Sequence, residues 1–563
     1  MRERAKKLLS LFSVTALCAG MLVGCGEVDN QQSSSSDPGQ ESTGQQESGS
    51  TESTEQADAD ADADADAGPE EFTYPMDHVK LTLNYSAEEN GWGSLSAEEA
   101  FSDPEKYLMG GIGVLSQGSG AYIETNGITA DSRGEEFMYM LISHDLPDII
   151  VNCFHKSYKG GPAAAIDEGY IIDLNEHPEW MPNYLAYLEE NPDVRSQVTT
   201  DDGRIWCFAN IEDTEYAMQD RGIVFRKDIL DELQMEVPVT IDEFEEVLRA
   251  VKAKYPDMIP FSSEMRWLYQ QAMLSSISNA YQCAYPFYCV DGENVQFAMY
   301  DDNFKAFLQR MNQWWEDGLI DPDFPSVGKG DVRGKLAKGE LFAAHQQASN
   351  SATSVNSCEI EGAEFMAIPA LKMQESDTVY NYLLTGMKTI YTFNFSVSAT
   401  SQNVEAAMRF CDFCFSEEGQ TIYNFGLEGL SYTRDAQGNI QLLPKEERYK
   451  DEKGNGLAKR TCWAGEVIGE GMYMDDVERE FADIYNHFDA YAGVDTPMND
   501  EESAVYGSYF ADLDTYCQEK MIGLVLGTES FDNWETIQAT CRDTYHADEV
   551  TAVIQSAYTR NLK

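Results

Sequence analysis

The stretch 203–252 constrains the fold most, because short apolar runs alternate in it with an amphipathic pattern. Residues 204–208 and 222–225 suit short strands. Thr240 and Glu243 have the spacing of a capping box, which starts a helix with apolar residues every three or four positions. This alternation of strands and helices predicts an α/β domain with a largely parallel sheet. The residues expected on the buried helix face are Ile241, Phe244, Val247, Leu248 and Val251.

The length of the chain, 563 residues, is too great for a single hydrophobic core, so two or more lobes are expected. The alternating run 79–85 predicts the first strand, and residues 145–151 turn into another strand. The loop 85–94 follows the first strand at its carboxyl end. Open α/β sheets bind their ligands at this end of the strands, so the loop is a candidate part of a binding site.

The net charge narrows the range of partners. The sequence has 98 Asp and Glu against 39 Lys and Arg, which gives a formal charge of −59. A charge of this sign and size disfavours binding to nucleic acid and to anionic lipid surfaces. It suits a well-solvated protein in the ionic medium outside the cell.

The first 24 residues read as a targeting segment. A basic start is followed by an apolar run over 8–23, which is short for a membrane span. The run ends at Leu22-Val23-Gly24-Cys25, which resembles the bacterial lipobox and implies cleavage before Cys25 and lipid attachment to its thiol. An ordinary signal peptide or a membrane anchor is the alternative.

Residues 25–71 are expected to form a disordered acidic tether. The part 27–71 contains fourteen Asp or Glu and no Lys or Arg, and it has almost nothing apolar to bury. The alternating Ala and Asp of 57–67 could instead be read as a calcium loop. That reading is disfavoured because the run lacks the central Gly and the final Glu of an EF-hand loop.

Several motifs occur in the order and spacing of one protein family. They are Asp202–Trp206, Arg226–Leu230, Pro238–Thr240, Gly318–Phe324 and Gly426–Tyr432. With them the chain resembles the extracellular solute-binding proteins of bacterial ABC importers, the carbohydrate-type lipoproteins of Gram-positive bacteria. The resemblance runs from about residue 79 to the C-terminus and is poorest over 435–521.

The resemblance implies an α/β, two-lobed periplasmic-binding-protein-like fold of type II, in which each lobe is a sheet flanked by helices and a hinge joins the lobes. The expected organisation is a lipoprotein signal peptide (1–24), the tether (25–71), a first part of lobe 1 (72–208), lobe 2 (209–390), a return to lobe 1 (391–450) and a C-terminal segment packed mainly on lobe 2 (451–563).

The resemblance also implies that the protein binds its ligand and does not catalyse a reaction. The protein is expected to sit on the outer face of the cell membrane through its lipid, as a monomer, and to capture an oligosaccharide by hinge closure. Its partners would be the carbohydrate and the transmembrane subunits of an ABC permease. Two alternatives stay open at this point, a secreted glycoside hydrolase or lyase, and a surface sensor that binds glycans without transport.

Aromatic residues in the expected loops are the candidates for the binding site, because the apolar face of a sugar ring packs on an aromatic side chain. Trp206 and Trp267 are expected to face the ligand from the second lobe, with Glu88 and Trp92 from the first. Any single Trp is more often a packing residue than a ligand residue, and at least two of the set are expected to line a cleft. The expected ligand-binding residues are Glu88, Trp92, Trp206, Asp213, Trp267, Tyr269, Glu428 and Trp463, and further polar candidates nearby are Asn90, Glu264 and Arg266.

The sequence carries none of the common motifs for catalysis or for binding metals and cofactors. The sequence has no H-E-x-x-H, no P-loop and no G-x-S-x-G, so no cofactor and no metal-binding site residue is expected, whereas the presence of a structural metal ion stays open. Cys411 and Cys414 form a C-x-x-C, but they lie on the apolar side of an expected helix and are read as buried thiols. Cys283 and Cys289 could pair in an oxidising space, which spacing alone leaves open.

Overall fold

The computed structural model describes residues 73–77, 79–84, 115, 118–125, 133–152, 154–211, 221–270, 274–390, 393–448 and 464–562. The targeting segment, Cys25 and the tether lie outside this part of the chain. The chain divides into two compact units, Met1–Thr73 and Tyr74–Lys563, and every element below belongs to the second unit. Within the described ranges, no helix is long and apolar enough to cross a membrane.

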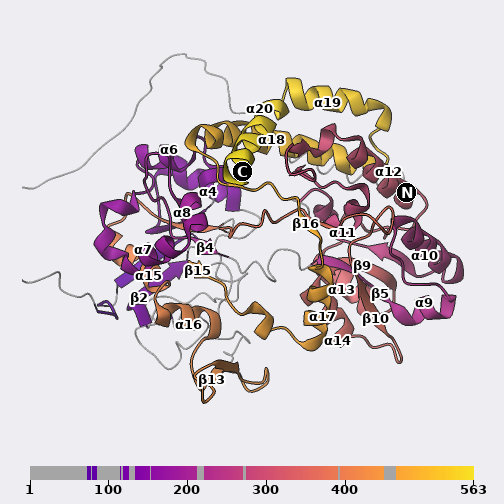
Figure 1. The fold of residues 1–563 in the computed structure, drawn as a ribbon, viewed down its shortest axis with the longest axis horizontal. Coiled ribbons are helices and arrows are strands. Elements are labelled where there is room, and N and C mark those ends of the chain that lie inside the picture. Colours follow the sequence, from indigo (N-terminus) through magenta and orange to yellow (C-terminus); the bar gives the residue numbers. More distant parts are fainter. Residues whose placement is uncertain are drawn as a thin grey trace, which may run out of the picture. The chain divides into compact units, whose positions relative to one another are not determined.

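The first lobe is built on a four-stranded sheet in the order β12-β3-β1-β2 (Figure 1). Strand β1 runs parallel to β2 and β3, whereas β12 returns from far along the chain and runs antiparallel to β3. The strands are β1 (Val79–Leu83), β2 (Ala121–Thr125), β3 (Ile149–Asn152) and β12 (Asn394–Val397). The helices are α4 (Arg133–Ser143), α5 (Phe154–Ser157), α6 (Gly161–Asp167), α7 (Pro182–Glu190), α8 (Pro192–Val198), α15 (Val404–Phe413) and α16 (Glu417–Phe425).

The second lobe has its own four-stranded sheet, in the order β10-β5-β9-β6. Strand β6 runs parallel to β9, whereas β5 runs antiparallel to both β9 and β10. The strands are β5 (Arg221–Arg226), β6 (Ile259–Ser262), β9 (Leu341–Gln347) and β10 (Phe365–Ile368). The helices are α9 (Lys227–Leu233), α10 (Ile241–Lys254), α11 (Ser275–Ser278), α12 (Asp302–Glu316), α13 (Lys329–Ala337), α14 (Ala348–Asn356) and α17 (Asp476–Tyr485).

The expected two-lobed α/β fold is therefore confirmed, with two corrections in detail. The second sheet is mixed and not largely parallel, because two successive helices lie between β5 and β6 and β6 runs opposite to β5. Residues 204–208 form no regular strand and make only isolated bridges. The capping box is confirmed: Thr240 accepts from the Glu243 amide at 3.3 Å, and the Glu243 carboxylate accepts from the Thr240 amide at 2.9 Å.

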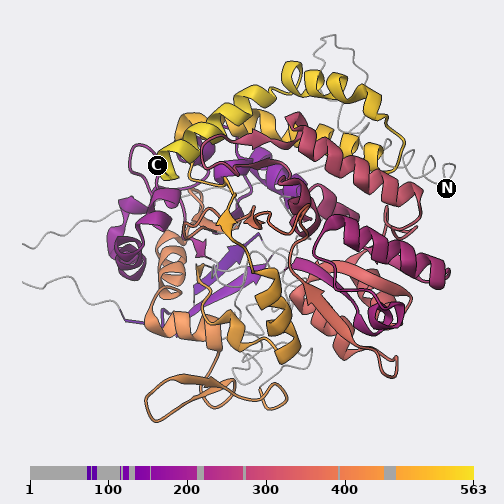
Figure 2. The same ribbon diagram turned by 45° about the vertical axis from the view of Figure 1, so that its right-hand side comes forward.

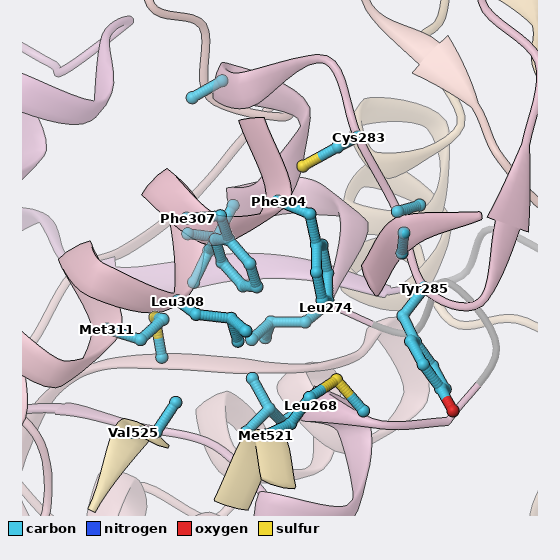
Figure 3. Packing of buried hydrophobic residues seen from close by; sticks show 14 of the residues in the cluster. Leu268, Leu274, Cys283, Tyr285, Phe304, Phe307, Leu308, Met311, Met521 and Val525 are labelled. Carbon is cyan, nitrogen blue, oxygen red and sulfur yellow. The ribbon is translucent and has the colours of Figure 1, made fainter. Parts of the chain in front are cut away.

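The C-terminal helices contact elements of both lobes. They are α18 (Asp500–Val525), α19 (Trp534–Asp543) and α20 (Ala547–Leu562). Helix α18 contacts α5 and α6 of the first lobe and α12 of the second, and it also contacts α19 and α20. Figure 2 shows the yellow helices lying alongside α12. In Figure 3, Met521 and Val525 of α18 meet Leu308 and Met311 of α12 in the largest apolar core.

Four short strand pairs accompany the two sheets. Two of them join segments far apart in sequence, because β4 pairs with β15 and β11 pairs with β16. The pairs are β4 (Asn210–Ile211) with β15 (Gly465–Glu466), β7 (Phe287–Tyr288) with β8 (Gln296–Phe297), β11 (Tyr380–Asn381) with β16 (Ala490–Tyr491), and β13 (Tyr432–Arg434) with β14 (Ile440–Leu442).

Candidate functional site

Amide side chains lie at the carboxyl ends of two parallel strands in the first lobe. Asn84 follows β1, and Asn152 ends β3. The Asn84 amide oxygen accepts from the Val151 backbone amide at 2.7 Å, which fixes this side chain against the end of β3. Ser157 donates a short hydrogen bond to the Asn152 amide oxygen. Both amides are thus buried at the sheet edge where α/β proteins hold ligands.

Two more asparagines reach the same edge from distant segments. Asn394 starts β12 and stands opposite Asn152 in the register. Its amide oxygen accepts from the backbone amide of Asn210 at 3.0 Å. Asn210 lies in β4, directly before the chain passes on to the second lobe. We call these four residues, Asn84, Asn152, Asn210 and Asn394, the amide edge.

The Asn210 side chain is the polar group of the amide edge that lacks a partner. It is 1% exposed, and neither its amide nitrogen nor its amide oxygen has a hydrogen-bond partner within the described ranges. A buried amide without partners costs roughly 1–3 kcal/mol, so native structures normally satisfy such a group with protein, water or ligand. The Asn210 amide therefore has hydrogen-bonding capacity that the described residues leave unused.

The matching edge of the second lobe carries an ion pair and a buried ring pair. After β6, Arg266 donates through Nε to the Glu264 carboxylate at 2.7 Å. Glu264 is buried, whereas Arg266 remains exposed to solvent while it holds the pair. Behind them Trp267, 2% exposed, meets the His345 ring of β9 edge to face at 5.1 Å.

His345 stays neutral at the end of β9. Burial, with the nearby positive charge of Arg221 adding to it, lowers the pKa of His345 to about 3. Neither ring nitrogen has a hydrogen-bond partner among the described residues. The ring therefore supports Trp267 by shape and adds no charge to this edge at neutral pH.

The two expected tryptophans both lie inside a lobe. Trp206 is 1% exposed and belongs to the core of the first lobe, so its expected place in the second lobe is wrong. Its indole N–H donates to the Gln197 carbonyl at 3.2 Å, which satisfies the polar atom of the ring. Trp267 lines a small pocket of about 10 Å³ with Tyr285. Tyr269 is half-buried nearby, and burial raises its pKa.

Glu428 is exposed and lies in a different place, a groove of about 660 Å³ that none of the four amides lines. Its carboxylate is 3.7 Å from the Arg434 guanidinium, which also lines the groove together with Tyr432. The remaining expected site residues are outside the described part of the chain, and their roles stay predictions. They are Glu88, Trp92, Asp213 and Trp463.

The cysteines of the described ranges are all free thiols. Cys411 and Cys414 are buried as expected, and the Cys414 thiol donates to the Phe410 carbonyl at 3.4 Å. Cys283 and Cys289 do not contact each other through their sulfur atoms; Cys283 donates to the Ser278 carbonyl and Cys289 to the Asp291 carboxylate. In the same ranges, no group of three His, Cys, Asp or Glu is placed to hold a metal ion.

Comparison with known proteins shows which family and which relatives the chain is similar to. The family model described as bacterial extracellular solute-binding protein matches residues 157–432. Over 516 residues the chain is 23% identical to the fructooligosaccharide ABC transporter substrate-binding protein FusA of Streptococcus pneumoniae serotype 4. The aligned part covers 79% of this chain and 88% of that protein.

Two solved structures show the same fold. The alginate-binding protein AlgQ2 without calcium ion matches with a TM-score of 0.66 at 19% identity, covering 86% of this chain and 98% of that one. FusA of S. pneumoniae in complex with kestose matches with a TM-score of 0.65 at 19% identity, covering 86% of this chain and 99% of that one. At these identities the likeness establishes the fold alone.

Proposed function

Because the chain belongs to the bacterial extracellular solute-binding proteins, we propose that it is the substrate-binding component of an ABC importer. It captures an oligosaccharide between its lobes and delivers it to the permease for import. The relatives are substrate-binding proteins and not enzymes, which favours binding over turnover.

The observation that carries the proposal is the amide edge. An asparagine side chain presents one acceptor and two donor hydrogens, which matches the mixed donor and acceptor character of sugar hydroxyls. Four such residues lie where the strands of the first lobe end, and the Asn210 side chain among them is buried without a partner in the described ranges. The Arg266 and Glu264 pair offers further polar groups from the second lobe.

We further propose that the solute is a neutral oligosaccharide. The amide edge carries no charge, and His345 is neutral beside Trp267. A chain of net charge −59 repels an anionic solute such as a uronate polymer. Of the two relatives, FusA is named for a fructooligosaccharide and AlgQ2 for alginate, and the charge of this chain favours the first class.

The anchoring is proposed from the sequence. Lipid on Cys25 would hold the protein on the outer face of the membrane, and the acidic segment before residue 72 would let the folded part reach the permease. The bound form would be a monomer, since one chain supplies polar groups from both lobes.

The test is calorimetry of the wild type against neutral and uronate oligosaccharides, followed by Asn210→Leu on the best ligand. Leucine has a similar volume and removes both unpaired amide atoms, so stability should hold. Loss of two hydrogen bonds to the ligand should weaken binding about tenfold or more. Wild-type affinity of Asn210→Leu for a verified ligand would refute the role of the amide edge.

A matched control is Asn424→Leu. The Asn424 amide is buried and fully bonded, because it donates to the Glu466 carbonyl at 2.9 Å and accepts from the Ile468 amide at 2.8 Å. This variant should lose stability and keep its affinity. Chromatography of the oligosaccharide after incubation tests the enzyme alternative, since a binding protein returns the ligand with its chain length unchanged.

A further inference from the structure

Two cysteine thiols from neighbouring helices meet in the core beneath the C-terminal helices. Cys517 lies in α18 and Cys541 in α19, and both are 0% exposed. Their sulfur atoms are 3.7 Å apart. The pair sits in the large apolar core, among whose members are Met521, Trp534 and Ile537.

This contact differs from those of the other described cysteines whose sulfur contacts are given above. The thiols of Cys283 and Cys414 donate to backbone carbonyls, and Cys289 donates to a carboxylate. In the Cys517 and Cys541 pair, each thiol has the other as its neighbour. A disulfide has its sulfur atoms about 2.05 Å apart, so side-chain rotation with little backbone movement would bring this pair to bonding distance.

We propose that Cys517 and Cys541 form a disulfide that joins α18 to α19. The two cysteines are 24 positions apart in the sequence, and the loop that the bond would close includes the turn at Gly527. Helix α18 contacts α5 and α6 of one lobe and α12 of the other. The bond therefore holds α19 against α18, the helix that contacts both lobes.

The chemistry is thiol–disulfide exchange with an external disulfide, such as oxidised glutathione or a disulfide oxidoreductase. One cysteine thiolate attacks the oxidant, forms a mixed disulfide and releases one thiol. The second thiolate then attacks the protein sulfur of the mixed disulfide and releases the second thiol. The two protein thiols lose two protons and two electrons in total, and the oxidant disulfide is reduced to two thiols.

The timing follows from burial. Burial raises the pKa of the Cys517 thiol, so little thiolate forms once the helices have closed over the pair. The bond should therefore form during folding outside the cell, a setting taken from the proposed function, and resist reductant afterwards.

Peptide mapping tests the proposal on the full chain. Lys520 lies between the two cysteines, so trypsin places Cys517 in peptide 480–520 and Cys541 in peptide 521–542. After unfolding and refolding in a glutathione redox buffer and alkylation without reductant, these peptides should appear joined. Reduction should separate them, and the oxidised protein should melt about 2–5 °C higher.

Two variants make the result specific. Cys517→Ser should abolish the joined peptide, whereas Cys411→Ser, a change at another buried thiol, should keep it. Separate alkylated peptides from refolded wild type with a native circular dichroism spectrum would overturn the proposal. Because glutathione supplies the oxidant and no ligand is present, this outcome is independent of whether the protein binds a sugar.

Discussion

Replacing His345 by Met isolates the effect of one buried histidine on acid stability. His345 is 1% exposed, and its two ring nitrogens have no hydrogen-bond partner within the described ranges. Met has a similar volume, bends to fit irregular space and makes good contacts with an aromatic ring such as Trp267. At pH 7 the exchange should change the free energy of unfolding little, because no bond is lost.

The magnitude in acid follows from linkage. The pKa of His345 is about 3 in the folded protein against a usual value of 6.5. Below pH 6.5 the unfolded chain therefore takes up a proton that the folded protein refuses, and stability falls as the pH falls. The loss is about 1.4 kcal/mol per pH unit and continues until the pH reaches the folded pKa.

Urea unfolding at pH 7.0, 6.0, 5.0 and 4.5 measures this loss. Between pH 6 and 4.5 the wild type should lose about 2 kcal/mol more than His345→Met, since that interval spans 1.5 units. His487, which is exposed, provides the matched control, and His487→Met should follow the wild type. Parallel pH profiles for the wild type and His345→Met would refute the assignment of a neutral buried ring.

Two further predictions follow from burial and from the N-terminal sequence. Trp206→Ala should lower the free energy of unfolding by about 3–5 kcal/mol, measured by urea titration, because the ring lies wholly in the first core; an unchanged midpoint would contradict this packing role. Cys25→Ala should move the protein from the membrane fraction to the soluble fraction, because it removes the proposed lipid attachment site, and unaltered fractionation would contradict the lipobox interpretation.

Local sequence patterns were enough to predict the α/β class, whereas the two-lobed arrangement followed from the family resemblance. The apolar face of 241–251 and its capping box appear in the structure as predicted, since both depend on residues within one or two helical turns. The direction of β5 was not predictable in this way. It depends on how two helices turn the chain between β5 and β6, and no residue of the strand itself encodes that turn.

The amide edge was missed for a related reason. Its members stand at positions 84, 152, 210 and 394, so no window along the sequence shows them together. Asparagine is also common in turns, and each one alone reads as a turn residue. Aromatic residues were the stronger candidates in the sequence because they suit sugar rings, but Trp206 packs in the core of the first lobe and Trp267 is buried in the second.

These tryptophans still bear on the site, because each stands beside a histidine at a sheet edge. His155 follows β3 and lies 5.5 Å from Trp206, and His345 lies 5.1 Å from Trp267. Desolvation is the main cause that lowers the pKa of both histidines to about 3. Neither ring gains a charge above pH 5, so both edges keep an uncharged aromatic support behind their polar groups. Such uncharged rings suit the neutral solute proposed above, whose hydroxyls need hydrogen bonds and would find them at the amides and at the Arg266–Glu264 pair.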